Sequence, residues 1–453
     1  MITVVGTGTG APPPEDILGA AELVVGGRRH LDAVRLPSGA EQVVLGPLAP
    51  ALDRIEAYVA KQAPVVVLAS GDPGFFGIVR VLAERFGAGL LDIRPGVSSV
   101  AAAFARAGLT WDDAVVVSAH GREVRTAVNV CRAHAKVAVL TGPGAGPAEL
   151  GAALLHSERV LVVASALGDP ERERVERVTP REAAARDWGT AVSVVLCLDE
   201  ARFPACTRGP VGAGRAVPRA PSGRCRTARP ATTDPRPAAG LRTVAGPGVG
   251  PDRWALDEGE FAHRDSMITK FEVRALALAR LGPRLGDLVW DVGAGSGSVA
   301  VECARLGAAV VAVEKTGDSV ERIRANAAAH GVDVQVLHGS APGVLSGLDD
   351  PDAVFVGGGG GDLPDIVTAC ARRARRAVVV AMAALDRVPA VREALTAAGF
   401  SCDGVLLQSS RLAPLPGDVT RLAATNPVFL LWGVRLQVPQ APQVPNETKG
   451  VAQ

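Results

Sequence analysis

The chain has 453 residues, of which 48% are hydrophobic, so it can form roughly two or three domains with sizeable cores. Its formal net charge of +1 provides no overall field that would attract nucleic acid or an anionic membrane. The first residues, MITVVGTGTG, have no basic region and no long apolar stretch, and no run of about eighteen apolar residues follows. We therefore expect neither export nor a membrane-spanning helix.

Cysteine and histidine spacing gives no sign of a metal site. The 7 cysteines include no CxxC pair, and the 7 histidines include no HExxH spacing. We therefore expect a reducing compartment, no disulfide framework and no bound metal.

Residues 202–250 differ sharply from the rest of the chain. They contain nine arginines, one acidic residue, eight prolines and eight glycines. This composition disfavours both helix and strand, and it predicts a solvated linker; a basic arm for an acidic partner is the alternative. We thus predict a domain over 1–201, a linker over 202–250, a second domain over 251–435 and a flexible tail over 436–453.

Short apolar runs alternate with helical patterns on both sides of this linker, which predicts α/β domains with parallel sheets. In the first half we predict strands over 2–6, 64–70, 90–95, 114–119, 136–141, 159–165 and 190–198. In the second half we predict strands over 287–293, 309–314, 332–339, 352–358, 377–382, 404–410 and 427–433. The two halves carry different glycine motifs, so we expect two different folds.

Residues 291–297, Asp-Val-Gly-Ala-Gly-Ser-Gly, lie between a predicted strand and a predicted helix. Glycines leave room for a ligand against the backbone. Ser298 stands where the dinucleotide fingerprint G-x-G-x-x-G needs its third glycine, which disfavours NAD. Glu314 ends the next strand, where a carboxylate can bind two ribose hydroxyls. The pattern resembles the S-adenosylmethionine site of Rossmann-like methyltransferases. The resemblance implies cofactor contacts from Gly293, Ala294, Gly295, Ser296, Gly297 and Glu314.

Two later loops fit the same fold. Ser340 and Ala341 follow the third predicted strand, where proteins of this fold usually contact adenine. Residues 357–361 are five successive glycines after the fourth strand, at the edge where open α/β sheets bind ligands. They indicate close approach of a large substrate, or a loop that is merely pliable.

The segment 261–281, FAHRDSMITKFEVRALALARL, precedes the glycine loop. Thr269 with Glu272 three residues later predicts a capping box at a helix start. The segment also resembles the C15-methylating, decarboxylating methyltransferases of corrin biosynthesis, and the resemblance extends over about 255–433. It implies that Thr269 reaches the cofactor.

The loops of the first half, taken together, resemble the tetrapyrrole methylase family. They read ASGDPGFFGI (69–78), RPGVSSVAAAF (94–104), SAHGR (118–122) and LTGPGAGPAEL (140–150). That family binds S-adenosylmethionine between two α/β lobes, which implies cofactor contacts from Ser70, Gly71, Asp72, Phe75, Ser98 and Ser99. The family's first loop usually reads G-x-G-P-G-D. This chain has Thr9 at the proline position and Ala11 at the acidic position.

Both families occur fused, in this order, in bifunctional precorrin-6Y C5,15-methyltransferases. The resemblance implies methylation of a precorrin at C5 by the first half. It implies methylation at C15, with release of CO₂ from the ring-C acetate, by the second. Methyl transfer needs positioning and a dry pocket rather than strong acids or bases. The substrate's carboxylates favour basic partners. The candidates for these partners are His120, Arg122, Arg264, Lys270 and Arg411. The alternative for each of them is a surface or structural role.

We expect a homo-oligomer in the cytoplasm, with no nucleic-acid or membrane partner. Three alternatives stay open at this point. The second half could belong to an NAD-dependent dehydrogenase, or the chain could methylate RNA or protein, although its balanced charge disfavours RNA. The first lobe could also be a binding scaffold with a degenerate site, because of Thr9 and Ala11.

Overall fold

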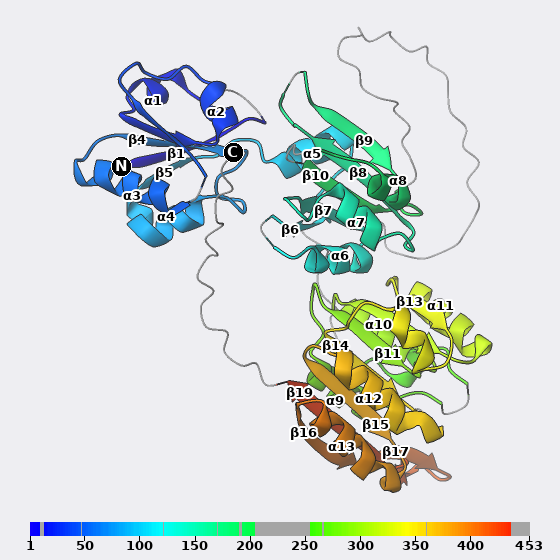
Figure 1. Ribbon diagram of the computed structural model, residues 1–453. Helices are drawn as coiled ribbons and strands as arrows, with labels where there is room; N and C mark the ends of the chain where they lie inside the picture. Colours follow the sequence, from blue (N-terminus) through cyan, green and yellow to red (C-terminus); the bar gives the residue numbers. More distant parts are fainter. Residues whose placement is uncertain are drawn as a thin grey trace, which may run out of the picture. The chain divides into compact units, whose positions relative to one another are not determined.

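The computed structural model describes residues 1–9, 13–46, 48–120, 122–169, 171–189, 193–203, 254–264, 267–358 and 360–435. All but the first two residues of the predicted linker, and the whole predicted tail, lie outside the described residues. The chain divides into two compact units, Met1–Gly248 and Val249–Gln453 (Figure 1).

The first unit begins with an open, fully parallel sheet. Its elements are β1 (Ile2–Thr7), α1 (Glu15–Gly19), β2 (Leu23–Gly26), α2 (Arg28–Asp32), β3 (Glu41–Val44), α3 (Leu48–Ala60), β4 (Val65–Ser70), α4 (Val79–Phe86) and β5 (Leu91–Arg94), with a 3₁₀ turn at Ala88–Leu90. The strand order is β3-β2-β4-β1-β5. Helices α3 and α4 cover one face through Ile55 and Leu82, and α1 and α2 cover the other through Leu18 and Leu31. Burial of both faces explains the continuous valine runs of β2 and β4.

A second sheet completes this unit. Its elements are α5 (Ser99–Ala107), β6 (Val115–Ser118), α6 (Val124–Ala133), β7 (Lys136–Leu140), α7 (Pro147–Ala153), β8 (Arg159–Ser165), β9 (Arg174–Val178), α8 (Pro180–Ala185) and β10 (Ser193–Asp199). The order is β6-β7-β10-β8-β9. Only β6 and β7 pair in parallel, so the expectation of parallel strands is wrong for this sheet. The last strand, β10, inserts between β7 and β8 and runs against both.

The second unit contains a 7-stranded sheet in the order β13-β12-β11-β14-β15-β19-β16. Its helices are α9 (Phe271–Leu281), α10 (Ser298–Arg305), α11 (Gly317–Ala329), α12 (Leu363–Arg373) and α13 (Val388–Ala397), with 3₁₀ turns at Glu258–Glu260, Gly343–Gly347, Gly360–Asp362 and Leu385–Arg387. Its strands are β11 (Leu288–Val292), β12 (Ala309–Glu314), β13 (Gln335–His338), β14 (Ala353–Gly357), β15 (Ala377–Met382), β16 (Phe400–Leu407), β17 (Ser410–Leu415), β18 (Val419–Ala424) and β19 (Val428–Arg435). The first five strands in this order, β13, β12, β11, β14 and β15, pair in parallel. Strand β19 runs antiparallel to both of its neighbours, β15 and β16. The predicted fold class, a two-lobed α/β unit followed by a Rossmann-like unit, is confirmed.

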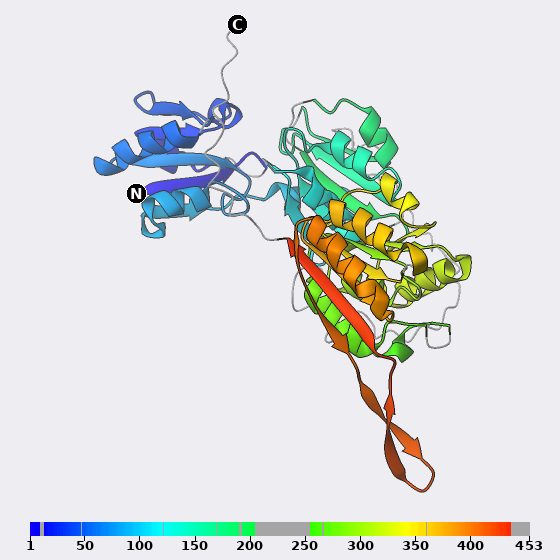
Figure 2. The same ribbon diagram turned by 60° about the horizontal axis from the view of Figure 1, so that its bottom comes forward.

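A β-hairpin, β17 and β18, stands apart from the 7-stranded sheet. Figure 2 shows it extending well beyond the helices of its unit. Leu412 and Leu422 pair across the hairpin and are 79% and 67% exposed. Val419 and Leu415 nearby are also exposed.

Within the described residues, no helix has both the length and the apolar character needed to cross a membrane. Nor do His, Cys, Asp and Glu side chains of these residues gather into a group that could hold a metal ion.

Candidate active sites

The glycine loop of the second unit lies between β11 and α10. Gly293 and Ala294 donate their N–H groups to Val313 O on the neighbouring strand at 2.9 and 3.2 Å. The N-cap of helix α10 is Gly297, which has no side chain to accept a hydrogen bond, and Asp291 Oδ2 accepts the N–H of Ala300 at 2.9 Å instead. Asp291 is 1% exposed, and burial raises its pKa to about 7. Its Oδ1 has no partner among the described residues.

Glu314, predicted from sequence as the acid beside this loop, does lie there. Its Oε2 accepts the N–H of Gly295 at 3.0 Å. Its Oε1 accepts from the backbone of Lys315 at 2.9 Å and from the backbone and hydroxyl of Thr316 at 3.1 and 3.0 Å. The carboxylate is thus fixed at the carboxyl end of β12.

Two further loops approach the same edge of the sheet. The N–H of Gly339 donates to Glu314 O at 2.9 Å, which brings the predicted residues Ser340 and Ala341 to this edge. A Cβ on Gly293 would lie 3.2 Å from Gly357 O, so the end of β14 contacts the glycine loop. By contrast, a Cβ on Gly295 would meet nothing within 4 Å, which leaves the middle of the loop accessible.

Asn326 on α11 links the segment before α9 to the glycine loop. Its side-chain oxygen accepts the N–H of Ala262 at 2.8 Å, and its Nδ2 donates to Ala262 O at 2.9 Å and Ser296 O at 2.8 Å. Asn326 is 3% exposed. The sequence analysis missed this residue, because an asparagine within a helical pattern carries no distinguishing signal.

An ion pair with fully buried side chains holds the same segment from its other end. Arg274 on α9 and Glu302 on α10 both have 0% side-chain exposure, and Arg274 Nε lies 3.4 Å from Glu302 Oε1. Arg274 also donates to Thr269 O at 2.5 Å and to Leu256 O, and Glu302 accepts the N–H of Leu256 at 2.5 Å. This pair was also missed.

The predicted capping box at Thr269 is wrong. Helix α9 begins at Phe271 with Lys270 as its N-cap, and the Lys270 side chain makes no capping hydrogen bond. Glu258 accepts the N–H of Phe271 at 2.9 Å and so takes the capping role. Thr269 lies in the segment that Arg274 fixes.

Three of the predicted substrate contacts lie in this unit. Arg411 donates to Glu258 at 2.8 Å and to Glu272 at 2.7 and 3.0 Å, and this pairing lowers the pKa of Glu258 to about 2. Its charge is already matched within the protein, which argues against a substrate role. Arg264 is exposed and lies 3.9 Å from the Met267 sulfur, whereas Lys270 is partly buried.

In the first unit, the loops after β1, β4 and β5 meet at the carboxyl edge of the parallel sheet. A Cβ on Gly6 would lie 2.0 Å from Gly71 O and 2.3 Å from Gly96 N, so only glycine allows this approach. The N–H of Gly96 donates to Gly71 O at 3.2 Å. The hydroxyl of Thr9 donates to Val97 O. Ala11, the other departure from the family's first loop, lies outside the described residues.

The structure brings most of the predicted residues of this unit together here. Asp72 Oδ1 accepts the N–H of Gly74 at 2.9 Å and shapes the turn after β4. Ser98 caps α5 by accepting the N–H of Ala101 at 3.1 Å. A Cβ on Gly71 would lie 3.2 Å from Ser99 N, which joins the two loops. Phe75 is 37% exposed at the rim.

Ser70 at the end of β4 contacts two residues that the sequence analysis missed. Arg29 Nη2 donates to Ser70 Oγ at 2.5 Å, and His30 Nε2 lies 2.9 Å from the same oxygen. Both belong to α2, which follows β2. Nothing in the sequence GGRRH marks them, because their partner is about forty residues away.

The remaining predicted contacts, His120 and Arg122, lie between β6 and α6 of this unit. Both are exposed. His120 Nδ1 lies 3.3 Å from Thr141 O, and a Cβ on Gly142 would lie 2.9 Å from the same nitrogen. His120 therefore packs against the loop after β7.

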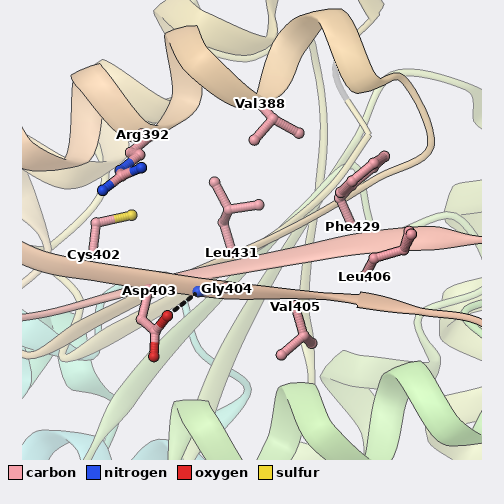
Figure 3. A pocket seen from close by; sticks show the side chains of 9 residues that line it. All are labelled: Val388, Arg392, Cys402, Asp403, Gly404, Val405, Leu406, Phe429 and Leu431. Atoms are coloured by element: carbon pink, nitrogen blue, oxygen red, sulfur yellow. Dashed lines mark hydrogen bonds between the residues drawn. The ribbon is translucent and has the colours of Figure 1, made fainter.

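A separate cavity lies between α13 and strands β16 and β19 of the second unit (Figure 3). Cys402, Leu406, Phe429 and Leu431 point towards the helix, whereas Asp403 points away. Its lining contains none of the predicted site residues. It belongs to the antiparallel end of the sheet, and we assign no site there.

The fold defines two α/β units, and in each of them loops gather at the carboxyl edge of parallel strands, where open α/β sheets bind ligands. Residues 1–184 match the family described as tetrapyrrole (corrin/porphyrin) methylases, and residues 260–434 match a precorrin methyltransferase domain. A Sinorhizobium protein named precorrin-6Y C(5,15)-methyltransferase (decarboxylating) is 34% identical over 76% of this chain and 74% of its own length. The chain belongs to the precorrin-6Y C5,15-methyltransferase (decarboxylating) family.

Two shorter relatives each match less than half of the chain. A Salmonella typhimurium protein named cobalt-precorrin-7 C(5)-methyltransferase is 34% identical over 44% of this chain and 100% of its own length. A Pyrobaculum calidifontis protein named "Probable cobalt-precorrin-6B C(15)-methyltransferase (decarboxylating)" is 36% identical over 36% of this chain and 87% of its own length.

Proposed function

We propose that this chain methylates a precorrin macrocycle at C5 and C15, with decarboxylation of the ring-C acetate, in cobalamin biosynthesis. The observation that carries the proposal is the presence of both methyltransferase families in one chain, in the arrangement of a relative that aligns over 76% of it. The dehydrogenase, RNA and protein alternatives lose their support, because neither family is described in those terms.

We propose S-adenosylmethionine as the methyl donor in both units. The second unit fits an adenosine-containing ligand, because the fixed Glu314 carboxylate lies beside a glycine loop whose centre at Gly295 is open. When bound, the donor supplies a methyl group on a positive sulfur. The protein's own part is to position the two reactants and to exclude water.

The exposed residues of the first unit suit a large, flat, apolar ligand with acidic substituents. Phe75, Phe76 and Val97 are 37%, 47% and 47% exposed on loops that contact one another. They offer an apolar rim for a macrocycle.

We further propose that 1–201 carries C5 methylation and that 251–435 carries C15 methylation with decarboxylation. The division of the chain at Gly248 and Val249 supports this assignment, as do the two shorter relatives.

One experiment tests reaction and assignment together. The full chain is incubated with methyl-labelled S-adenosylmethionine and the precorrin, and products are followed by mass. We expect two methyl groups gained and one CO₂ lost per macrocycle. Fragments 1–201 and 251–453, assayed separately, should divide these changes between them. The reaction is wrong if the full chain transfers no methyl group, and the assignment is wrong if one fragment performs both steps.

Glu314→Ala should weaken S-adenosylmethionine binding to the second unit by on the order of 2–4 kcal/mol, because a carboxylate that accepts two ribose hydroxyls is lost. Calorimetry on the full chain measures this as the loss of one of two binding events. Glu321→Ala, which removes an exposed acid on α11, should bind like the wild type. Unchanged binding in Glu314→Ala removes this residue from the cofactor site.

We propose that the chain forms a homo-oligomer through the β17–β18 hairpin, because its paired leucines are too exposed for an isolated arm. Leu412→Asp with Leu422→Asp should lower the molar mass measured by light scattering. Thr420→Asp, which adds a charge to the same hairpin without removing an apolar side chain, should not. A monomeric wild type, or an unchanged mass in the double variant, contradicts the proposal.

A cytoplasmic location and the absence of a nucleic-acid partner stay predictions.

A further inference from the structure

Arg29 occupies a defined position at the site of the first unit. Its Nη2 donates to Ser70 Oγ at 2.5 Å, and its Nε donates to His30 Nε2 at 3.3 Å. A Cβ on Gly8 would lie 3.1 Å from His30 Cε1, so the imidazole packs against the loop after β1. Arg29 therefore lies where the loops after β1, β2 and β4 come together, and its side chain is exposed enough to meet a ligand.

The positive charge of Arg29 is not matched within the described part of the chain. No carboxylate among those residues forms an ion pair with it, and the undescribed stretch closest in sequence, Gly-Ala-Pro at 10–12, has no ionisable side chain. Arg411, by contrast, has two glutamate partners, and Arg274 has Glu302.

Both partners of Arg29 are neutral near pH 7. Burial, reinforced by the Arg29 charge, lowers the pKa of His30 to about 4, so the imidazole is uncharged and one ring nitrogen is free to accept a hydrogen bond. Ser70 Oγ accepts from Arg29 and lies 2.9 Å from His30 Nε2, so both neutral side chains contact the guanidinium and each other. A guanidinium has five N–H donors, and the described residues accept from two of them, which leaves donors for a bidentate acceptor.

We propose that Arg29 binds a carboxylate of a ligand in the site of the first unit, and that Ser70 and His30 hold its guanidinium in position. The proposal rests on the proposed function, which supplies two sources of that carboxylate: the acidic side chains of the tetrapyrrole and the amino-acid end of S-adenosylmethionine. Arg29 is then a specificity-determining residue, because it favours an acidic ligand over its ester or amide.

Full-length Arg29→Ala tests the proposal in the methyl-transfer assay. C5 methylation is taken as the methyl groups transferred in excess of CO₂ released, and KM is measured for each substrate. We expect KM to rise about 10- to 100-fold for the substrate whose carboxylate is bound, as for loss of a charge-assisted hydrogen bond. A rise for the tetrapyrrole alone assigns its acidic side chain, and a rise for S-adenosylmethionine alone assigns the cofactor.

Arg28→Ala is the matched control, since Arg28 is the exposed neighbour of Arg29 on the same helix. Arg29→Lys keeps the positive charge but lacks the planar, bidentate donors of the guanidinium, so its KM should lie between those of the wild type and Arg29→Ala. The inference is overturned if both KM values in Arg29→Ala stay within about twofold of Arg28→Ala. Should Arg29→Ala not fold, Arg29→Gln is measured instead, and unchanged KM values there overturn it equally. A wild type that transfers no methyl group would instead defeat the proposed function.

Discussion

Gly295→Val is expected to reduce CO₂ release more than about a hundredfold while one methyl group is still added to the macrocycle. Gly295 has φ +59°, a conformation that costs a β-branched residue roughly 1–2 kcal/mol. A Cβ there meets no protein atom within 4 Å, so the side chain would fill the space that we assign to the cofactor. Mass spectrometry of the product distinguishes one methylation without decarboxylation from the complete reaction.

Gly331→Val separates ligand exclusion from backbone strain. Gly331 has φ +65° and equally open surroundings, but it follows α11 and is not part of the glycine loop. It should lower stability to a similar extent and leave CO₂ release intact. Equal loss of CO₂ release in both variants would show that strain is the cause. Loss of both methylations in Gly295→Val would show that the two sites are obligatorily coupled.

Arg274→Met is expected to destabilise the second unit by about 3–5 kcal/mol, because it leaves the Glu302 carboxylate buried with less compensation. It also removes the donors to Leu256 O and Thr269 O. Urea unfolding followed by tryptophan fluorescence should show an earlier transition for Trp290 and Trp432, which lie in this unit.

The same substitution at Arg324 is the control, since Arg324 forms an exposed ion pair with Glu321 on α11. Its cost should stay within about 1 kcal/mol. Arg274→Met combined with Glu302→Met should restore much of the lost stability, because two apolar side chains can replace a buried pair. A single variant as stable as the Arg324 control would mean that the buried pair contributes little.

Several of the strands that the sequence revealed are buried along most of their length. Val65–Leu68 and Val378–Val380 are continuous apolar runs, and each falls within a strand of the structure. β3 and β9 were missed because they lie at sheet edges, where charged residues such as Glu41 and Arg174 replace that signal. The short strand β2 and the hairpin β17–β18 were also missed.

The candidate sites divide in a similar way. Glu314 could be placed because the loop and the following strand are local in sequence. The partners of Glu272 and Ser70 could not, because Arg411 lies 139 residues away from the first and Arg29 lies 41 residues from the second. Such long-range pairs depend on the tertiary fold. The capping box expected at Thr269 does not form, because Arg411 donates to the Glu272 carboxylate that the box would have used as its acceptor.

The buried amide of Asn326 has a consequence for how the second unit opens. It bonds to Ala262 and Ser296 through one side chain. If either stretch of chain moves away, a buried polar group loses its hydrogen-bond partner. The segment around Ala262 and the glycine loop should therefore fluctuate as one cooperative block rather than fray separately. A ligand that reduces the fluctuations of the glycine loop would therefore also reduce those of the neighbouring segment that contains Arg264.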